Sequence, residues 1–497
     1  MRRMLPALAV VLLAAGPALA QDAAARFAEL KANAETKKPL AEGLKILSAY
    51  FKYEGMIRNE GKFVQTKMDA EQQRFTNWLA GSKNSIGVDL LEDVELLMEL
   101  MDEARVKADW GITKKVRPGS LDYVRRPLEG RKETFDFTVR VPRQYKPKSR
   151  RYPLVISMHR AVLNRRHRAF RDAGEFRQRG RQPITEYWAD RNQPARDKVI
   201  VIAPTGLPVG YQFKGRALQD VWDVWLSVRE SMRLYRVDWD RIFVELEGIA
   251  MRFACQQPFG VTGYIVRDGE LAAEDMFLLE NLNGVPLLYV ANEARGDVSK
   301  RMIEGLKAAY AKTEPKNLII LHGKRDNQGG LKGDMAQIAE FVTTRRRMPW
   351  PKKITWRFPD GLTVEPFLFA VLKAETEHDG ELPLEQMVGR MTLEFKSDTY
   401  EEDGEKRPYT RVEVNITEAE QLRLRLHDGI AVMSDPITIV VNGVEVASRV
   451  MIKRDFRYFV ENVLPGRFFM IPFMGETLVD FKFTPQWKRP ERTSSDQ

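Results

Sequence analysis

The residue types that carry acid–base, nucleophilic or metal chemistry are sparse in this sequence. It has 5 histidines, and Cys255 is its only cysteine. No two histidines have the spacing of zinc ligands, and one cysteine forms neither an internal disulfide nor a thiolate zinc site. A glycine-rich phosphate loop and a dinucleotide fingerprint are also missing from the sequence. We therefore expect neither a metal centre nor a cofactor.

An arginine-rich segment offers a different chemistry. Residues 160–181 carry 8 arginines and His167 against only Asp172 and Glu175. A guanidinium presents a planar fork of donors that suits phosphate, sulfate or carboxylate, so one interpretation is an anion-binding rim. The alternative is a solvated helix face whose arginines pair with acidic helices near the N-terminus. The candidate ligand-binding residues are Arg160, Arg165, Arg166 and Arg168.

Two regions of different patterning precede this segment. Residues 21–110 predict packed amphipathic helices, because apolar residues recur at helical spacing, as in Leu40, Leu44, Leu47 and Phe51. This helical region is either a plain structural cap or a partner-binding module. Residues 111–132 contain Gly, Pro and many charges without a period, and they predict a linker.

The rest of the chain changes from alternating strands and helices to strands alone. Residues 133–349 contain short apolar runs, such as Pro153–Met158 and Val199–Pro204, that are typical of parallel strands buried on both faces. Helical segments between them predict a mostly parallel sheet flanked by helices. Residues 350–485 are strand-rich, with an Asn-Gly hairpin signal at Asn442, and they predict a small β-sandwich-like domain. Residues 486–497 predict a disordered tail.

Residues 133–347 resemble secreted bacterial esterases of the α/β-hydrolase superfamily, the feruloyl-esterase and polyhydroxybutyrate-depolymerase-like group. The segments that carry the resemblance keep the order of the family, and a looser likeness extends to about residue 472. They are Val139–Pro142 with Tyr145, Tyr152–His159, Ala203–Gly206, Asp220–Trp222, Tyr235–Ile242 and Pro351–Arg357. The resemblance implies an α/β-hydrolase fold and carboxylic ester hydrolysis.

The catalytic elements of that family are degenerate here. Its nucleophile lies in a Gly-x-Ser-x-Gly elbow, and the matching positions hold Leu246, Gly248 and Ala250, so a glycine replaces the serine. His159, where the oxyanion loop should begin, is followed by Arg160 and not by glycine.

The acid and the base of the family's triad are also displaced. Glu293 and Asp297 lie near the acid position, and Asp297 is a candidate displaced acid. The loop expected to carry the base contains no histidine, and His322 comes a few residues too early. A triad without its nucleophile keeps little catalytic power.

Two residues near the degenerate elements are candidates for a replacement nucleophile. Ser157 precedes Met158 and His159 at a strand end, and Cys255 lies seven residues after Gly248. Both fit better as structural residues, the serine within a strand and the cysteine as a buried thiol.

The start of the chain predicts export. Arg2 and Arg3 precede an apolar run, and Ala18-Leu19-Ala20 forms a small-x-small cleavage site, so we expect a signal peptide cleaved after Ala20. No later segment has the roughly 18 apolar residues that a transmembrane helix needs, so the mature chain should be periplasmic or extracellular without a membrane span.

Composition is that of an ordinary globular protein, with 30% charged and 43% hydrophobic residues among 497 and a formal net charge of +10. It excludes wholesale disorder and collagen-like repeats, and the thinly spread charge does not favour nucleic acid. We expect an exported pseudo-hydrolase that binds an anionic ligand or glycan, or an envelope protein. The alternatives are a serine esterase or peptidase with an unrecognised nucleophile and a structural component of an envelope assembly.

Overall fold

The computed structural model describes most of the chain between residues 19 and 480. Outside the described residues lie 1–18, 61–63, 91–92, 109–120, 128–133, 147–149, 159–187, 189–193, 205–217, 326–330, 333–334, 348–350, 360–368, 374–387, 417–420, 427–430, 433, 453–474 and 481–497. The predicted signal peptide, apart from its last two residues, and the predicted tail therefore fall outside the description.

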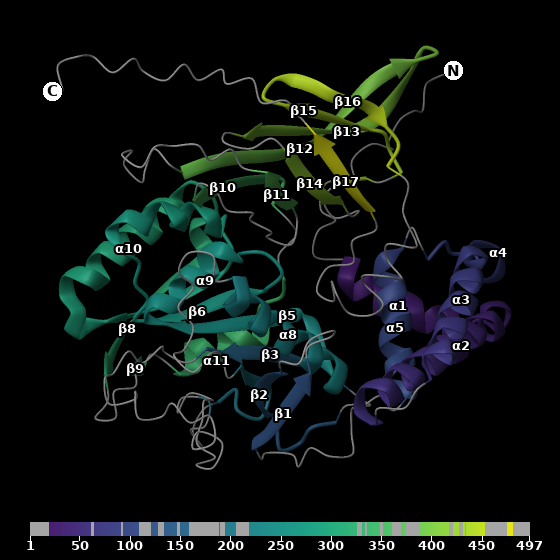
Figure 1. The fold of residues 1–497 in the computed structure, drawn as a ribbon, viewed down its shortest axis with the longest axis horizontal. Coiled ribbons are helices and arrows are strands. Elements are labelled where there is room, and N and C mark those ends of the chain that lie inside the picture. Colours follow the sequence, from purple (N-terminus) through teal and green to yellow (C-terminus); the bar gives the residue numbers. More distant parts are fainter. Residues whose placement is uncertain are drawn as a thin grey trace, which may run out of the picture.

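The N-terminal region is a group of packed helices (Figure 1). The predicted apolar stripe is buried, since Leu44, Leu47 and Phe51 have exposed fractions of 2% or less. Asp93 begins the last of these helices, with its side chain accepting a hydrogen bond from the Leu96 amide at 3.1 Å. The helices are α1 (Leu19–Ala32), α2 (Ala34–Glu60), α3 (Gln65–Ala80), α4 (Ser82–Ile86) and α5 (Val94–Lys107).

A nine-stranded sheet forms the centre of the described chain, in the order β1-β2-β4-β3-β5-β6-β7-β8-β9. Strands β3 to β8 run parallel, whereas β1, β2 and β9 pair antiparallel at the edges. The predicted α/β fold class with a mostly parallel sheet is confirmed. The strands are β1 (Leu121–Pro127), β2 (Thr134–Arg140), β3 (Tyr152–Ser157), β4 (Ile200–Pro204), β5 (Val237–Glu247), β6 (Gly263–Arg267), β7 (Leu287–Asn292), β8 (Leu318–Arg325) and β9 (Leu331–Lys332).

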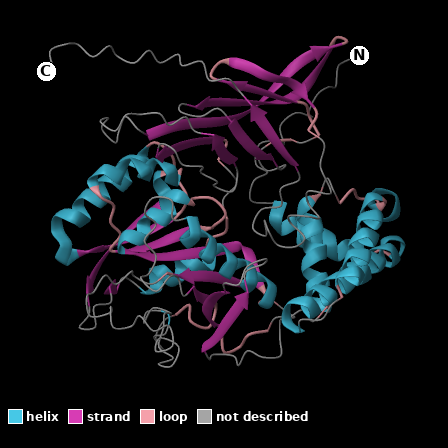
Figure 2. Cartoon of the chain, in the orientation of Figure 1, coloured by secondary structure: helices cyan, strands magenta, loops and turns pink. Residues whose placement is uncertain are grey.

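Helices cover both faces of this sheet (Figure 2). Successive residues of β3 enter different cores: Leu154 and Ile156 join the larger cluster, and Val155 joins a second one with Phe341 of α11. Burial on both faces explains why the parallel strands are continuous apolar runs. The covering elements are α8 (Leu218–Leu234), α9 (Met251–Gln256), α10 (Gly296–Ala311), α11 (Met335–Thr344) and the 3₁₀ helix η3 (Ala273–Leu282).

The predicted linker is partly wrong, because residues 121–127 form strand β1. This strand pairs antiparallel with β2, from Leu121 opposite Arg140 to Pro127 opposite Thr134. Val124 is buried with 8% exposure, whereas the flanking residues are mostly polar. An edge strand is held by backbone hydrogen bonds and needs few apolar residues, so composition did not reveal it. Strand β6 was also missed; it is five residues long and fully buried.

The C-terminal region contains a five-stranded sheet, β10-β12-β13-β15-β16, and a three-stranded sheet, β11-β14-β17. The predicted hairpin at Asn442 is confirmed: it joins β15 to β16, and Asn442 and Gly443 have φ of 49° and 81°, as a type I′ turn requires. The strands are β10 (Lys353–Pro359), β11 (Phe369–Lys373), β12 (Val388–Glu402), β13 (Glu405–Ile416), β14 (Gln421–Leu426), β15 (Ile437–Val441), β16 (Val444–Val450) and β17 (Gly475–Asp480).

The three regions are joined by packing. Apolar residues of the helical region, the central sheet and the β-rich region belong to one continuous buried cluster. Asn281 and Asn283 of the central region bond the backbone of β10 through Arg357 and Thr355, at 2.6–2.8 Å. Within the described residues, no helix is long and apolar enough to cross a bilayer.

Candidate functional site at the carboxyl edge of the central sheet

The turn after β5 has the backbone shape of a sharp strand-to-helix bend. The strand ends at Glu247, and Gly248 starts a short 3₁₀ turn that leads into α9. Gly248 has a φ of 61°, a conformation that L-residues rarely adopt. Its carbonyl accepts a hydrogen bond from the Glu270 amide at 3.1 Å, which fixes the turn to the segment after β6. The predicted nucleophile position therefore lies on a bend that suits glycine.

Directly below this turn, the carboxylate of Glu245 is almost completely buried, with 1% exposure. Its Oε2 accepts hydrogen bonds from Ser157 Oγ and Trp188 Nε1, both at 2.7 Å. Its Oε1 lies 2.6 Å from Arg267 Nη2, and that arginine is 5% exposed. A buried charge is tolerated when it is paired and hydrogen-bonded in this way. Three strands and Trp188 thus meet at one internal ion pair.

A second polar cluster joins the ends of β6 and β7. Asp268, with a φ of 48°, is 2% exposed, and its carboxylate accepts from Asn292 Nδ2 at 3.3 Å. The same carboxylate lies 3.4 Å from Arg295 Nη1, and Arg295 also pairs with Glu270. Ser299 Oγ donates to the Asn292 carbonyl at 2.9 Å. Through Glu270 this cluster connects to the Gly248 turn.

The charges of the second cluster compensate one another. Burial disfavours the charge on Arg295, but the hydrogen bond to Glu270 and the attraction of Asp268 outweigh it and raise the pKa of Arg295. Burial likewise raises the pKa of Tyr289, whose hydroxyl donates to the Gly269 carbonyl at 2.8 Å. Arg295 is thus held by two carboxylates, and its charge is compensated without a ligand.

The candidate acids do not enter this cluster. Asp297 is exposed in the first turn of α10 and makes none of the hydrogen bonds or ion pairs just described. Glu293 is also exposed, and its carboxylate lies 3.6 Å from Lys324 Nζ, a contact between two solvent-exposed side chains. The buried carboxylates at this edge are Glu245 and Asp268.

The candidate base is also misplaced. His322 lies within β8, opposite Ala291 of β7, and it is exposed. The strand continues for three residues beyond it, to Arg325, so His322 is not in the loop where the family carries its base. His159 and the candidate ligand-binding residues Arg160, Arg165, Arg166 and Arg168 lie outside the described residues.

Neither replacement nucleophile is accessible. Ser157 has 0% exposure and donates its hydroxyl to Glu245, and a carboxylate-bound, buried hydroxyl offers no route for a substrate. Cys255 is fully buried in α9, and burial raises the pKa of its thiol well above the usual range. A reactive thiolate needs partial exposure and a lowered pKa, so this cysteine is inert.

Sequence reasoning missed Asp268, Asn292 and Arg267. Asp268 was missed because β6, the strand before it, was not recognised. The Asp-Gly pair after the apolar run Tyr264–Val266 could have indicated the end of this strand. Arg267 had no signal, because its pairing with Glu245 connects two different strands. Among the described residues, no group of three His, Cys, Asp or Glu side chains could hold a metal ion.

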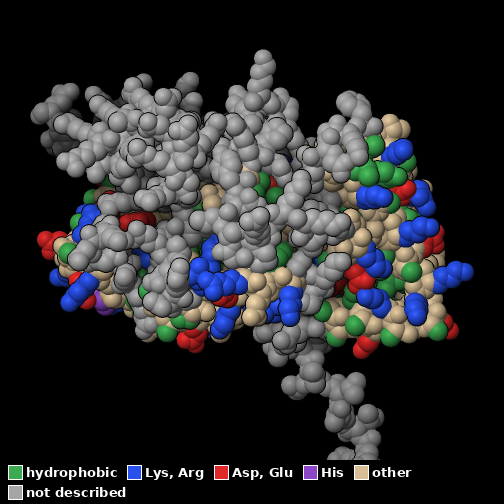
Figure 3. Space-filling view, turned by 90° about the horizontal axis from the view of Figure 1, so that it is seen from below, with side chains coloured by type: hydrophobic (Ala, Val, Ile, Leu, Met, Phe, Trp, Pro, Cys, Tyr) green, Lys and Arg blue, Asp and Glu red, His purple; other side chains and the backbone are tan. Residues whose placement is uncertain are grey.

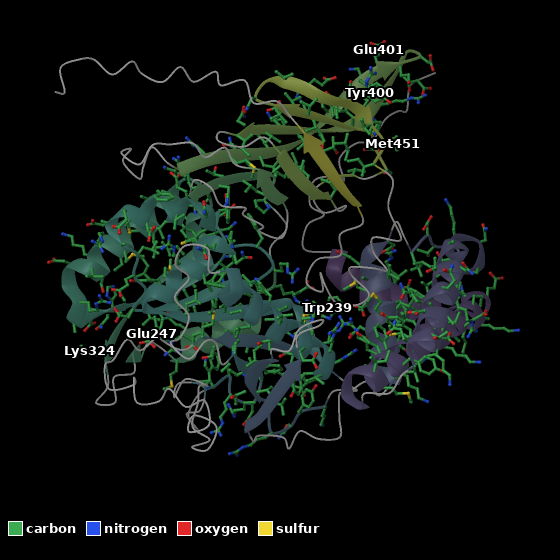
Figure 4. All side chains as sticks on the ribbon, in the orientation of Figure 1. Trp239, Glu247, Lys324, Tyr400, Glu401 and Met451 are labelled. Atoms are coloured by element: carbon green, nitrogen blue, oxygen red, sulfur yellow. The ribbon has the colours of Figure 1, made fainter. Side chains whose placement is uncertain are left out.

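The helical region lies at the opposite, amino-terminal edge of the sheet. Figure 4 shows Trp239, near the start of β5, on the side of the helices, and Glu247, at its end, on the far side with Lys324. Arg105 of α5 lies over the Trp239 ring, 5.4 Å from its centroid. The helices therefore do not cover the Gly248 turn.

Buried ion pairs hold this opposite edge together. Asp102 lies 2.5 Å from both Arg151, which precedes β3, and Arg236, which precedes β5. Glu99 accepts two hydrogen bonds from Arg151, at 2.7 and 2.8 Å. Glu54 of α2 lies 3.3 Å from Arg233 of α8, and both side chains are about 5% exposed or less. The acidic groups of the helices are thus used in docking to the sheet.

No family model matches the sequence, and no curated protein matches it. Among solved structures, a thermostable esterase is similar over 46% of this chain and 63% of its own, with 14% identity and a TM-score of 0.32. An S-formylglutathione hydrolase from Agrobacterium tumefaciens is similar over 46% and 94%, with 14% identity and a TM-score of 0.30.

An enterobactin esterase from Shigella flexneri is similar over 47% of this chain and 60% of its own, with 10% identity and a TM-score of 0.31. The chain spans less than two thirds of the thermostable esterase and of this enterobactin esterase. The fold class follows from the sheet itself, whose strand order and parallel pairing are those of a mixed α/β protein with a mostly parallel central sheet.

Proposed function

We propose that this protein is an exported, non-catalytic relative of the α/β-hydrolases, a pseudo-hydrolase that acts by binding. The observation that carries the proposal is Gly248, with a φ of 61°, at the strand-to-helix bend where those enzymes place their nucleophile. Glycine has no side-chain oxygen. The hydroxyl of Ser157, which is buried at this edge, is bound to Glu245.

The polar groups around the bend support the same conclusion. A catalytic site directs its nucleophile, base and acid toward one reacting atom. Here Arg267 is directed to Glu245, and Arg295 to Asp268 and Glu270. Each charge is therefore compensated by a neighbour in the protein, as in a structural ion-pair network.

An anionic group is the ligand that we propose, with Arg160, Arg165, Arg166 and Arg168 as contacts. The support is the composition of this segment and the position of its two ends. Met158, before it, donates its amide to the Glu245 carbonyl at 2.9 Å. Trp188, after it, donates to the Glu245 side chain. The described residues on either side of this segment thus both contact Glu245 of β5.

Export rests on the sequence of the first 20 residues, with cleavage after Ala20. Acidic glycans and an envelope protein are the partners that fit an exported protein of this charge. Over the described part of the face seen in Figure 3, Lys and Arg side chains are mixed with acidic ones, with a larger basic group near its middle. The thinly spread excess of positive charge in the sequence does not favour nucleic acid.

The test is labelling of the chain from residue 21 onward by a fluorophosphonate, together with turnover of short-chain nitrophenyl esters. A heat-denatured sample and an active serine esterase are the controls. We expect no labelling beyond that of the denatured sample and no turnover above background. Labelling specific to the native fold would overturn the proposal in favour of a serine esterase or peptidase. The Ser157→Ala variant would then show whether Ser157 is the labelled residue.

A further inference from the structure

A buried arginine at the end of β2 has donors without acceptors. Arg140 is 3% exposed, and its Nη1 donates to the Trp188 carbonyl at 2.7 Å. Its Nε and Nη2 are buried and have no hydrogen-bond partner. Among the described residues, the carboxylate that pairs with Arg140 is that of Asp197, 3.9 Å from Nη2, and the Asp197 side chain is 48% exposed. That distance is too long for a hydrogen bond.

Two further arginines lie around Arg140. Arg196 is half-buried in the turn before β4, and its Nε is also buried without a hydrogen-bond partner. Arg143 is exposed just after β2, and its amide donates to Asp197 Oδ1 at 3.3 Å. Burial, then the positive charge of Arg196, and to a smaller extent that of Arg143, lower the pKa of Arg140 to about 10, although Asp197 acts in the opposite direction.

Buried guanidinium donors without acceptors lower the stability of the fold unless a ligand accepts their hydrogen bonds. Buried donors without acceptors are rare in folded proteins, and each destabilises the native state. A buried arginine is normally paired with a carboxylate, as Arg267 and Arg233 are in this chain. Among the described residues, Arg196 and Arg143 add positive charge around Arg140, and Asp197 is the carboxylate within 4 Å of it. These three arginines and one aspartate carry an excess of about two positive charges.

We propose that Arg140, Arg196 and Arg143 bind a small, doubly charged oxyanion, a phosphate or sulfate group. The guanidinium forks match the oxygens of such a group, and its charge would compensate the excess left by Asp197. Arg143 and Asp197 are exposed, so the site opens to solvent on their side. It goes beyond the proposed function, because its arginines belong neither to the Gly248 turn nor to the arginine-rich segment: Arg140 ends β2 and pairs with Val201 of β4.

The experiment measures binding of inorganic phosphate to the full chain by calorimetry, and the midpoint of thermal unfolding against phosphate concentration. Sodium chloride at the same ionic strength is the control. Because a ligand of the native state stabilises it by mass action, we expect the midpoint to rise with the logarithm of phosphate concentration and not with chloride.

Two variants locate the site. Arg196→Gln should weaken phosphate binding by about tenfold or more, because it removes a charged donor from the site. Lys198→Gln is the matched control: it removes the same charge from an exposed neighbour and should change affinity by less than about threefold. Arg140→Gln should abolish the shift in the unfolding midpoint, provided that its circular dichroism spectrum is unchanged.

Other outcomes have definite meanings. Equal losses for Arg196→Gln and Lys198→Gln would mean diffuse attraction and would overturn the site. If only the double variant Arg165→Gln/Arg166→Gln loses phosphate binding, the anion binds to the arginine-rich segment. This inference would then fail, while the proposed function would stand. Sulfate should bind like phosphate, whereas acetate, with one charge, should bind more weakly. Failure of both phosphate and sulfate to bind the wild type overturns the inference outright.

Discussion

The two edges of the central sheet use buried charge in different ways. At the amino-terminal edge, Asp102 and Glu99 of α5 pair with Arg151 and Arg236, so the ions join two regions of the chain. At the carboxyl-terminal edge, Glu245 and Arg267 pair within the sheet itself. The ion pairs of the first edge join the helical region to the sheet, and that of the second edge joins β5 to β6. Buried charge is thus compensated between regions at one edge and inside the sheet at the other.

The largest effect should come from breaking the amino-terminal edge. Asp102→Ala leaves Arg151 and Arg236 without their shared carboxylate and should lower the free energy of unfolding by about 3–5 kcal/mol. Urea denaturation followed by circular dichroism measures it. Glu103→Ala is the control on the same helix, since the ion-pair partners of Glu103 among the described residues are the exposed Lys31 and Lys107, and it should cost less than about 1 kcal/mol. Equal losses would show that the interface does not depend on its buried ions.

A slightly smaller effect is expected at the carboxyl-terminal edge. Glu245→Gln keeps the volume but removes the charge opposite Arg267 and one of the acceptor oxygens, and should cost about 2–4 kcal/mol. Glu293→Gln, which alters the solvent-exposed contact with Lys324, should cost under about 0.5 kcal/mol. Urea denaturation followed by circular dichroism measures both free energies of unfolding. A neutral Glu245→Gln would mean that this network is not structural, and it would reopen a catalytic role.

The turn itself should give a third, smaller effect. Gly248→Ala introduces a side chain at a φ of 61° and should cost about 1–2 kcal/mol from backbone strain. Gly81→Ala is matched to it, because Gly81 has a φ of −95° and its added Cβ would make ordinary contacts at 3.6 Å. It should change stability by less than about 0.5 kcal/mol. A Gly248→Ala variant as stable as wild type would contradict the assigned bend.

The smallest effect concerns pH at the junction with the β-rich region. Burial tends to raise the pKa of Glu280, but hydrogen bonds from Arg357 and Lys312 outweigh it and lower the pKa. A depressed carboxyl pKa stabilises the fold above the unfolded value, about 4.3, and this stabilisation is lost as pH falls through the folded value. Unfolding free energies from pH 6 to 3 should therefore fall less steeply in Glu280→Gln, by under about 1 kcal/mol. Parallel curves would contradict this.

The sequence by itself determined the elements in which the pattern of apolar side chains matches the pattern of burial. Strands β3, β4 and β7 are apolar runs because both faces are covered, and the Asn442-Gly443 turn is specified by two residues that accept positive φ. The position of Gly248 came instead from the resemblance to the Gly-x-Ser-x-Gly elbow of the esterases, and Gly248 has a positive φ in the structure. Strand β1 was not predicted from the sequence. An edge strand is held by backbone hydrogen bonds, so it needs no particular pattern of side-chain types.

Only the tertiary structure decided which charges meet. Arg267 reaches Glu245 across neighbouring strands, Asp268 joins Arg295 across a strand and a loop, and Arg140 is left beside Arg196. These contacts leave no periodic pattern in the sequence, because the strand order and the burial of the side chains decide which charged residues come together. For the same reason the sequence favoured Asp297 as a surviving acid, whereas the fold leaves it exposed on α10 and buries Asp268 instead. Residue types thus determined which side chains could carry charge or attack a substrate, and packing decided which of the described charges are paired.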